Sequence, residues 1–307
     1  MQVKNNTSID MGKTKKWSWI AFKAFITIVS FYFIHDQFED RTVTQSLDFP
    51  DHFISIMIFQ FFLMIVNWIL EIHRWKISVD SSEKISFRQA SIDVLGGLTM
   101  NWIVPFTVGD FITRIATKRD KYKATSAIFL NRVIMLFLTL LVGLHGLISL
   151  LHVNGLYLMV GASILAAVLF VADRVTHGRF SRYFTELNRK TLWKIILISI
   201  CRYGIFFLQF IILIAIFNPE LATVTISAGI GWVFLVRTSI PSLFGGVGLR
   251  EASALFFFQN LVTDTVTVVF PVFVLWVLNT AIPSLLGSLL LWKFKTHNSE
   301  DSHNIAR

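Results

Sequence analysis

Long apolar runs separated by short polar segments are the main pattern along this chain. A helix needs about 20 apolar residues to cross the hydrocarbon core of a bilayer. The runs that come near or exceed this length are residues 17–34, 53–70, 124–151, 156–172, 195–217 and 265–292. Two further apolar stretches, 92–105 and 222–262, contain or end at Pro and Gly residues. The pattern predicts an all-α polytopic membrane protein with about six full spans and two interrupted elements.

The two interrupted elements contain a similar short sequence. Residues 101–114 read NWIVPFTVGDFITR, and residues 237–250 read RTSIPSLFGGVGLR. A single offset of 136 residues aligns Pro105 with Pro241, Gly109 with Gly245, and Arg114 with Arg250. Pro and Gly interrupt helical hydrogen bonding, which a bilayer tolerates only where the freed backbone groups face protein or water. We therefore predict two broken re-entrant hairpins inside the membrane.

The distribution of Lys and Arg predicts the orientation. Basic residues concentrate in the tail 1–16, in the segments 71–91, 115–123 and 173–194, and just after residue 292. These segments are expected on the cytoplasmic side, together with both termini. The run 92–105 would form about 21 Å of helix against a core of roughly 30 Å, so the first hairpin enters and leaves from the cytoplasmic face. The second begins and ends outside, although 222–240 is long enough to span alone.

The two halves of the chain, about 53–151 and 195–292, then have the same order of elements in opposite orientation. Each consists of a span, a broken hairpin and a second span. This arrangement predicts an inverted repeat, which in transporters places the substrate near the midplane between discontinuous helices. We expect one transmembrane domain over residues 17–292, flanked by cytoplasmic tails 1–16 and 293–307.

Composition agrees with a membrane protein and excludes other classes. The 307 residues are 54% hydrophobic, with 30 Phe and 9 Trp, and the mean hydropathy is +0.63. The net charge of +9 follows from the basic cytoplasmic loops, and without a nucleic-acid-binding motif we expect no nucleic acid partner. The single cysteine, Cys201, excludes a disulfide framework and is expected in the core. We expect no metal or cofactor.

Ionisable residues at membrane depth are the main candidates for function. The bases are Arg114, Arg132, Arg202, Arg237 and Arg250, and the acids are Asp93, Asp110 and Glu251. The excess of positive charge predicts an anionic ligand. All five bases are arginine, whose guanidinium group stays protonated and matches the oxygens of a phosphate or carboxylate with two parallel hydrogen bonds.

Structural roles for these residues remain open beside the functional one. Asp110 and Arg114 are four residues apart, so on a helix they can neutralise each other. Arg250 and Glu251 are adjacent and should face different partners. Arg132 and Arg202 could instead donate to carbonyl groups of a broken helix. Asn101 could cap backbone groups that the break leaves without partners.

Glycines in the second element predict a backbone anion site. Gly245, Gly246 and Gly248 precede a helix that should begin near Leu249. Amide groups at a helix start bind anions with the help of the helix dipole, and Gly leaves them accessible. In the first element, a half-helix should start similarly at residues 108–110, with Asp110 in its first turn.

The stretch IPSLFGGVGLREA, the upstream pattern N-x-x-x-P-x-x-x-G-D-x-x-x-R and the later LNRV resemble the transmembrane region of lysylphosphatidylglycerol synthases, the flippase-like domain of multiple peptide resistance factor. The resemblance covers about residues 50–292. It implies a role in moving aminoacylated phospholipid between leaflets. It also points to a set of residues in this sequence: Asn101, Pro105, Gly109, Asp110, Arg114, Arg132, Pro241, Gly245, Gly248, Arg250 and Glu251. Only a 15-residue tail follows residue 292, so we do not expect the aminoacyl-transfer activity of the family's soluble domain.

The sequence thus predicts a lipid flippase of the bacterial inner membrane that is not an enzyme. Arg114 and Arg250 would hold a headgroup phosphate in one polar cavity, while Asp110 and Glu251 contact a cationic part of the headgroup or exchange partners. An intramembrane enzyme that transfers a group to or from a lipid phosphate is the alternative, with Asp110 or Glu251 as its base. A non-transporting partner subunit is a third hypothesis, and a homo-oligomer is left open.

Overall fold

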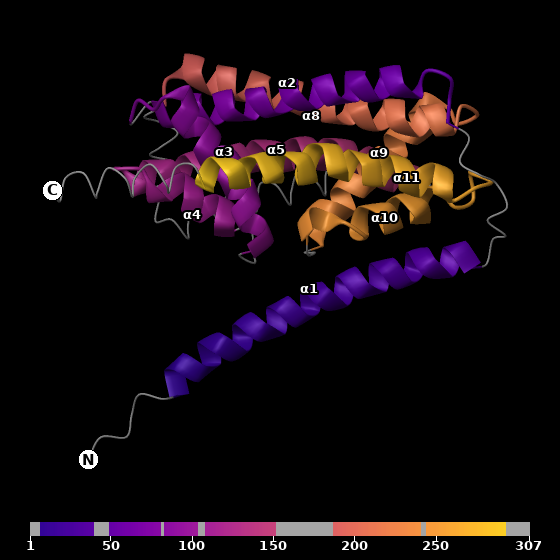
Figure 1. Cartoon of the computed structure of the whole chain (residues 1–307), viewed down its shortest axis with the longest axis horizontal. Helices are drawn as coiled ribbons and strands as arrows, with labels where there is room; N and C mark the ends of the chain where they lie inside the picture. The colour runs from indigo at the N-terminus through magenta and orange to yellow at the C-terminus, as the bar shows by residue number, and fades with distance from the viewer. Residues whose placement is uncertain are drawn as a thin grey trace.

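The computed structural model describes residues 7–39, 49–80, 83–103, 108–151, 187–240 and 244–292. These residues form helices and no strand (Figure 1). Within these described ranges, four helices are long and apolar enough to cross a membrane: Phe53–Asp80, Lys121–Leu150, Arg189–Phe217 and Val266–Trp292. The prediction of an all-α membrane protein is confirmed. The predicted span 156–172 and both prolines of the repeated sequence, Pro105 and Pro241, lie outside the described residues.

Helix α1 (Thr7–Glu39) contains the first predicted span, 17–34. It contacts helix α10 (Leu249–Phe258), and the ring of Phe31 lies beside Gly248. Figure 1 shows that the C-terminal part of α1 comes nearest to the other helices, whereas its N-terminal end points away from them.

Helices α2 (Phe53–Asp80) and α8 (Arg189–Phe217) pack antiparallel along one side of the bundle (Figure 1). The side-chain amide of Gln60 donates to the backbone oxygen of Gln209 at 3.1 Å, and Gln209 donates to the backbone oxygen of Gln60 at 3.0 Å. Near residue 53, the rings of Phe53 and Phe217 are 6.0 Å apart. This end is called the Phe53 end of the bundle, and the opposite one the Asp80 end.

Helix α2 is longer than predicted. The expected span ended at Leu70 because the charged residues after it were interpreted as a cytoplasmic loop. The helix continues to Asp80, and Glu71 and Arg74 are buried in it. Their charges can stay inside because ion pairs with other helices compensate the loss of water.

Helices α3 (Phe87–Ile103) and α4 (Val108–Ala116) form the first hairpin. They run antiparallel, because Gly97 lies against Asp110 while Gln89, near the start of α3, donates to Thr117 after the end of α4. Gly109 lies directly on the backbone of Met100, leaving no room for a side chain. The open side of this hairpin is at the Asp80 end, where Trp75 of α2 donates to Asp93 of α3 at 3.0 Å.

Helices α9 (Thr223–Ser239) and α10 form the second hairpin. The indole of Trp232 donates to the backbone oxygen of Ser253 at 3.1 Å, and Gly229 lies against Phe258, so the two helices are antiparallel. This hairpin opens at the Phe53 end. There the side chain of Asn218, which precedes α9, donates to the backbone oxygen of Thr267, in the helix that follows α10, at 2.9 Å. The two hairpins therefore open at opposite ends of the bundle.

The two hairpins contact each other beside the turn of the second one. Helix α3 contacts the 3₁₀ turn η1 (Phe244–Gly246) between α9 and α10. Trp102 of α3 stacks on Trp276 with ring centroids 5.8 Å apart. Trp276 ends α11 (Val266–Trp276), and the π-helical turn η2 (Val277–Ala281) follows it within the last span. Turns of this kind are frequent at functional sites.

Close helix packing holds the remaining elements. Helix α5 (Lys121–Leu151) runs antiparallel to α9, with Gly143 and Gly146 of α5 beside Gly231 and neighbouring residues of α9. Small residues let membrane helices approach closely. Cys201, expected in the core, is exposed on α8. That prediction was wrong because a helix that is apolar on all sides gives no signal for its outward face.

Candidate functional site

A buried carboxylate, Glu71 on α2, binds three guanidinium groups. Arg74 lies 2.6 Å from it, Arg114 of α4 lies 2.9 Å from it, and Arg202 of α8 lies 2.7 Å from it. All four side chains are mostly buried. A buried ionised carboxylate needs paired charges to compensate its lost hydration. Glu71 therefore ties three helices together through charge.

Arg114 extends this group towards the first hairpin. Its Nε donates to Asp110 at 2.6 Å, one helical turn earlier on α4, and Arg132 of α5 lies 3.5 Å from the same carboxylate. The side chain of Arg132 is 48% exposed, unlike the other members. We call these six side chains the arginine cluster: Glu71, Arg74, Asp110, Arg114, Arg132 and Arg202.

The arginine cluster carries more positive than negative charge. It contains four guanidinium groups and two carboxylates, an excess of two positive charges among its members. Without the half-exposed Arg132, the remaining five members carry an excess of one. Unbalanced buried charge is costly. A phosphate, with several anionic oxygens, fits guanidinium donors in the geometry that they prefer. The cluster can therefore bind an anion that approaches beside the half-exposed Arg132.

A second ion pair lies next to the cluster and is balanced. Lys118 and Asp93 are 2.6 Å apart, with both side chains 1% exposed. Trp75 donates to Asp93 at 3.0 Å, and the guanidinium carbon of Arg114 lies 5.0 Å from the centroid of the Trp75 ring. Trp75 thus connects the pair to the arginine cluster. Because its charges cancel, we assign this pair a structural role at the open end of the first hairpin.

The tip of the second hairpin contains another buried arginine. Arg250 is 2% exposed, and its Nη2 donates to the backbone oxygen of Gly245 at 2.5 Å and to the hydroxyl of Thr280 at 3.4 Å. Its Nε has no hydrogen-bond partner in the described part of the chain. Glu251 instead accepts from the backbone amide of Gly248 at 2.7 Å. The two adjacent side chains thus have different partners, as their angular separation on a helix predicts.

Local backbone geometry explains this tip. Gly245, Gly246 and Gly248 have φ values of 68°, 89° and 82°, a region that residues with a Cβ avoid. They turn the chain between α9 and α10, and α10 begins at Leu249 as predicted. Arg237, at the end of α9, is exposed. The tip of the second hairpin therefore contains two guanidinium groups, that of Arg250, which is buried, and that of Arg237, which is exposed.

The predicted site residues divide between these two places. Asp110, Arg114, Arg132 and Arg202 belong to the arginine cluster, whereas Arg250 and Glu251 belong to the tip of the second hairpin. Arg114 and Arg250 have separate sets of partners, and the single pocket in which both were expected to hold one phosphate stays a prediction. Asn101 has its expected role, since its side-chain oxygen accepts from the Asp110 amide at 2.9 Å.

Sequence reasoning missed Glu71 and Arg74. Both were assigned to a loop, although the i, i+3 spacing between them permits a pair on one face of a continuing helix. Trp75, which is fully buried, was the available signal that α2 continues. The partners Arg114 and Arg202 lie far from Glu71 in sequence. The role of Glu71 as a hub, one carboxylate that binds three arginines, therefore could not be inferred.

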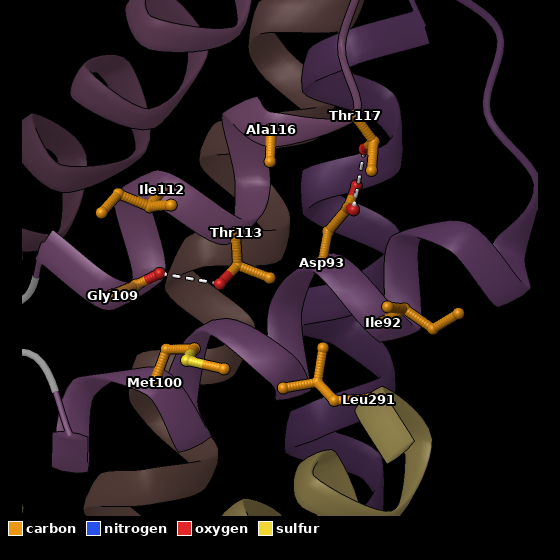
Figure 2. A pocket seen from close by; sticks show the side chains of 9 residues that line it. All are labelled: Ile92, Asp93, Met100, Gly109, Ile112, Thr113, Ala116, Thr117 and Leu291. Atoms are coloured by element: carbon orange, nitrogen blue, oxygen red, sulfur yellow. Dashed lines mark hydrogen bonds between the residues drawn. The ribbon is translucent and has the colours of Figure 1, made fainter. Parts of the chain in front are cut away.

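A pocket of about 240 Å³ lies on the first hairpin. Figure 2 shows its lining, which comes from α3, α4, the residue after α4 and the last span: Ile92, Asp93, Met100, Gly109, Ile112, Thr113, Ala116, Thr117 and Leu291. We call it the hairpin pocket. It contains no arginine, so it is distinct from the arginine cluster and from the tip of the second hairpin, whereas its Asp93 belongs to the pair with Lys118. In the part of the chain that is described, no group of three or more His, Cys, Asp or Glu could hold a metal ion.

Comparison with known proteins places this arrangement in a family. A search of the curated proteins and a search of the solved structures found no match. The family model for the lysylphosphatidylglycerol synthase TM region matches residues 20–287. The matched range includes the arginine cluster, both hairpins and the π-helical turn, and it covers most of the chain. This protein belongs to the lysylphosphatidylglycerol synthase TM region family and has a membrane-lipid-related role.

Proposed function

We propose that the protein moves a phosphate-bearing lipid headgroup between the two leaflets of a membrane. The observation that carries this proposal is the excess of two positive charges in the arginine cluster, whose member Arg132 is 48% exposed. Charged groups at membrane depth mark substrate pathways. An anionic or zwitterionic headgroup supplies the negative charge that the cluster lacks, while its hydrocarbon chains stay among the apolar helices.

The two hairpins supply the path in this proposal. Each enters the bilayer from one face and returns to it, and the two enter from opposite faces, as an inverted repeat requires. The contact between α3 and η1 then lies near the midplane. The basic segments assign the Asp80 end to the cytoplasm, with both termini on that side of a bacterial inner membrane. A headgroup moving between the ends must pass this contact.

The headgroup would bind at two places in succession. Arg132 and Arg114 receive the phosphate at the place nearer the Asp80 end. Asp110 then releases Arg114 and pairs with a cationic part of the headgroup. Arg237 and Arg250 receive it at the tip of the second hairpin. The separate partners of Arg114 and Arg250 support this order over simultaneous binding.

Transport in reconstituted vesicles tests the proposal. Fluorescent phosphatidylglycerol in the inner leaflet becomes accessible to an external quencher only after translocation. Arg132→Gln should lower the initial rate about tenfold, because a favourable charge contact of about 1.4 kcal/mol is lost, and Arg132→Lys should have a smaller effect. Exposed Arg88 provides the control Arg88→Gln. An unchanged rate in Arg132→Gln rejects the proposed function.

We also propose that the lipid is not chemically altered. Mass spectrometry of the lipid before and after incubation with the protein measures this directly. A new lipid species that requires Asp110 or Glu251 would instead support the enzymatic alternative.

Labelling of single cysteines tests the topology. In a Cys201→Ser background, cysteine at the exposed positions Ser86 and Thr223 should react from opposite sides of the membrane, the first from the cytoplasm. Reaction of both from one side contradicts the arrangement of the two hairpins.

A further inference from the structure

Helix α4 presents two chemically different faces. Gly109, Ile112, Thr113 and Ala116 line the hairpin pocket, with the spacing of one helical face. Asp110 and Arg114 belong to the arginine cluster. Residues 112 and 114 are two positions apart and therefore point about 200° apart on a helix. One short helix thus separates a charged site from the hairpin pocket.

The polar atoms in the pocket are already occupied within the protein. The hydroxyl of Thr113 donates to the backbone oxygen of Gly109 at 2.8 Å. Asp93 accepts from Trp75 and Gln89 and pairs with Lys118. Thr117 lies 3.4 Å from Asp93 (Figure 2). Since these groups have partners, the pocket offers mainly hydrocarbon surface to an occupant.

Glycines bring the walls of the pocket together. A Cβ at Gly96 would lie 2.8 Å from the side chain of Leu291 in the last span, and Gly109 lies on the backbone of Met100. These close approaches fix α4 and the last span against α3. The side facing away from the bundle is open, because Ile112 is 53% exposed and Ala116 and Thr117 are also exposed.

We propose that the hairpin pocket binds one hydrocarbon chain of a membrane lipid. Its walls belong to the first hairpin and to the last membrane-length helix, so its open side faces bilayer hydrocarbon. The inference rests on the proposed function. A lipid whose hydrocarbon chain lies along one face of α4 can place its phosphate beside the arginine cluster, which lies on the opposite face of α4. The pocket binds the chain of the lipid whose headgroup the cluster receives.

Photo-crosslinking tests this inference without a transport measurement. The protein is reconstituted with phosphatidylglycerol carrying a diazirine in the middle of one acyl chain, and labelled positions are identified by mass spectrometry. Met100 and Ile112 should be labelled several-fold more than Ile54 and Ile58, which are highly exposed on α2 and report ordinary surrounding lipid. Equal labelling of the two sets overturns the proposal.

A variant that fills the pocket provides the second criterion. Ala116→Trp should lower labelling of Met100 several-fold and leave Ile58 unchanged, whereas Trp at exposed Ala222 should change neither. If Ala116→Trp does not fold, Ile112→Gln at the exposed mouth replaces it and should also lower labelling of Met100. Unchanged labelling of Met100 in the folded variant overturns the proposal.

The outcomes separate this inference from the proposed function. Preferential labelling of Met100 in a protein that does not translocate phosphatidylglycerol supports the chain site and rejects transport. Translocation that depends on Arg132, in a protein whose pocket is labelled no more than Ile54, supports transport and rejects the chain site.

Discussion

Glu71 of α2 and Arg114 of α4 form a buried ion pair of 2.9 Å across a sequence separation of 43 residues. This pair connects the first hairpin to the long helix beside it. Because Glu71 also binds Arg74 and Arg202, loss of one carboxylate leaves three guanidinium groups near each other without their shared partner.

Glu71→Gln should therefore destabilise the protein strongly. Removing one partner of a buried charge pair typically costs about 3–5 kcal/mol, because the remaining charge is left uncompensated. Thermal unfolding in detergent, followed by loss of the monodisperse fraction, measures the change. Glu220→Gln is the control, since Glu220 is exposed and substitution there should stay within about 0.5 kcal/mol. Equal stability of the two variants would contradict the hub role of Glu71.

Lys118 and Asp93 should show strong coupling in a double-mutant cycle. Lys118→Met leaves a buried carboxylate unpaired and should cost about 3–5 kcal/mol. Adding Asp93→Asn removes that charge but keeps an oxygen that can accept from Trp75, so the double variant should recover most of the loss. The same cycle on Lys76 and Asp80, a partly exposed pair at 2.6 Å, should give at most about 1 kcal/mol. Additive losses for Lys118 and Asp93 would show that they are not coupled.

The breaks in the two hairpins could be predicted from sequence, whereas their ion pairs could not. Gly and Pro act on the backbone within a few residues, and the starts of α4 at Val108 and α10 at Leu249 followed from this local effect. The extension of α2 past Leu70 depends on Arg114 and Arg202, which belong to other helices. A window of sequence around Glu71 contains no information about these partners.

The same limit applies to the predicted phosphate site. The repeated sequence aligns Arg114 with Arg250, which suggested equivalent roles in one pocket. In the structure Arg114 binds two carboxylates, whereas Arg250 binds a backbone oxygen and a hydroxyl. Each arginine also has one partner outside the repeated sequence, Glu71 on α2 for Arg114 and Thr280 in the last span for Arg250.

Gly109 and Gly204 should respond oppositely to alanine. A Cβ at Gly109 would collide with the backbone of Met100 and separate α4 from α3, whereas a Cβ at Gly204 meets nothing within 4 Å. Gly109→Ala should therefore destabilise the hairpin, and Gly204→Ala should stabilise α8 by about 0.5–1 kcal/mol through a lower backbone entropy cost. Thermal unfolding of both variants in one detergent measures the difference. Equal effects would contradict the close contact between α3 and α4.

Asp110→Asn should strengthen binding of an anionic headgroup. The carboxylate of Asp110 lies 2.6 Å from Arg114 and 3.5 Å from Arg132, so it competes with a phosphate for both guanidinium groups. A gain of about 1–1.5 kcal/mol corresponds to roughly tenfold tighter binding. Binding of short-chain phosphatidylglycerol to the detergent-solubilised protein measures the affinity. Asp80→Asn is the matched control, because Asp80 pairs with Lys76 outside the cluster. Weaker or unchanged binding by Asp110→Asn would show that Arg114 and Arg132 hold the hairpin in place and do not receive the phosphate.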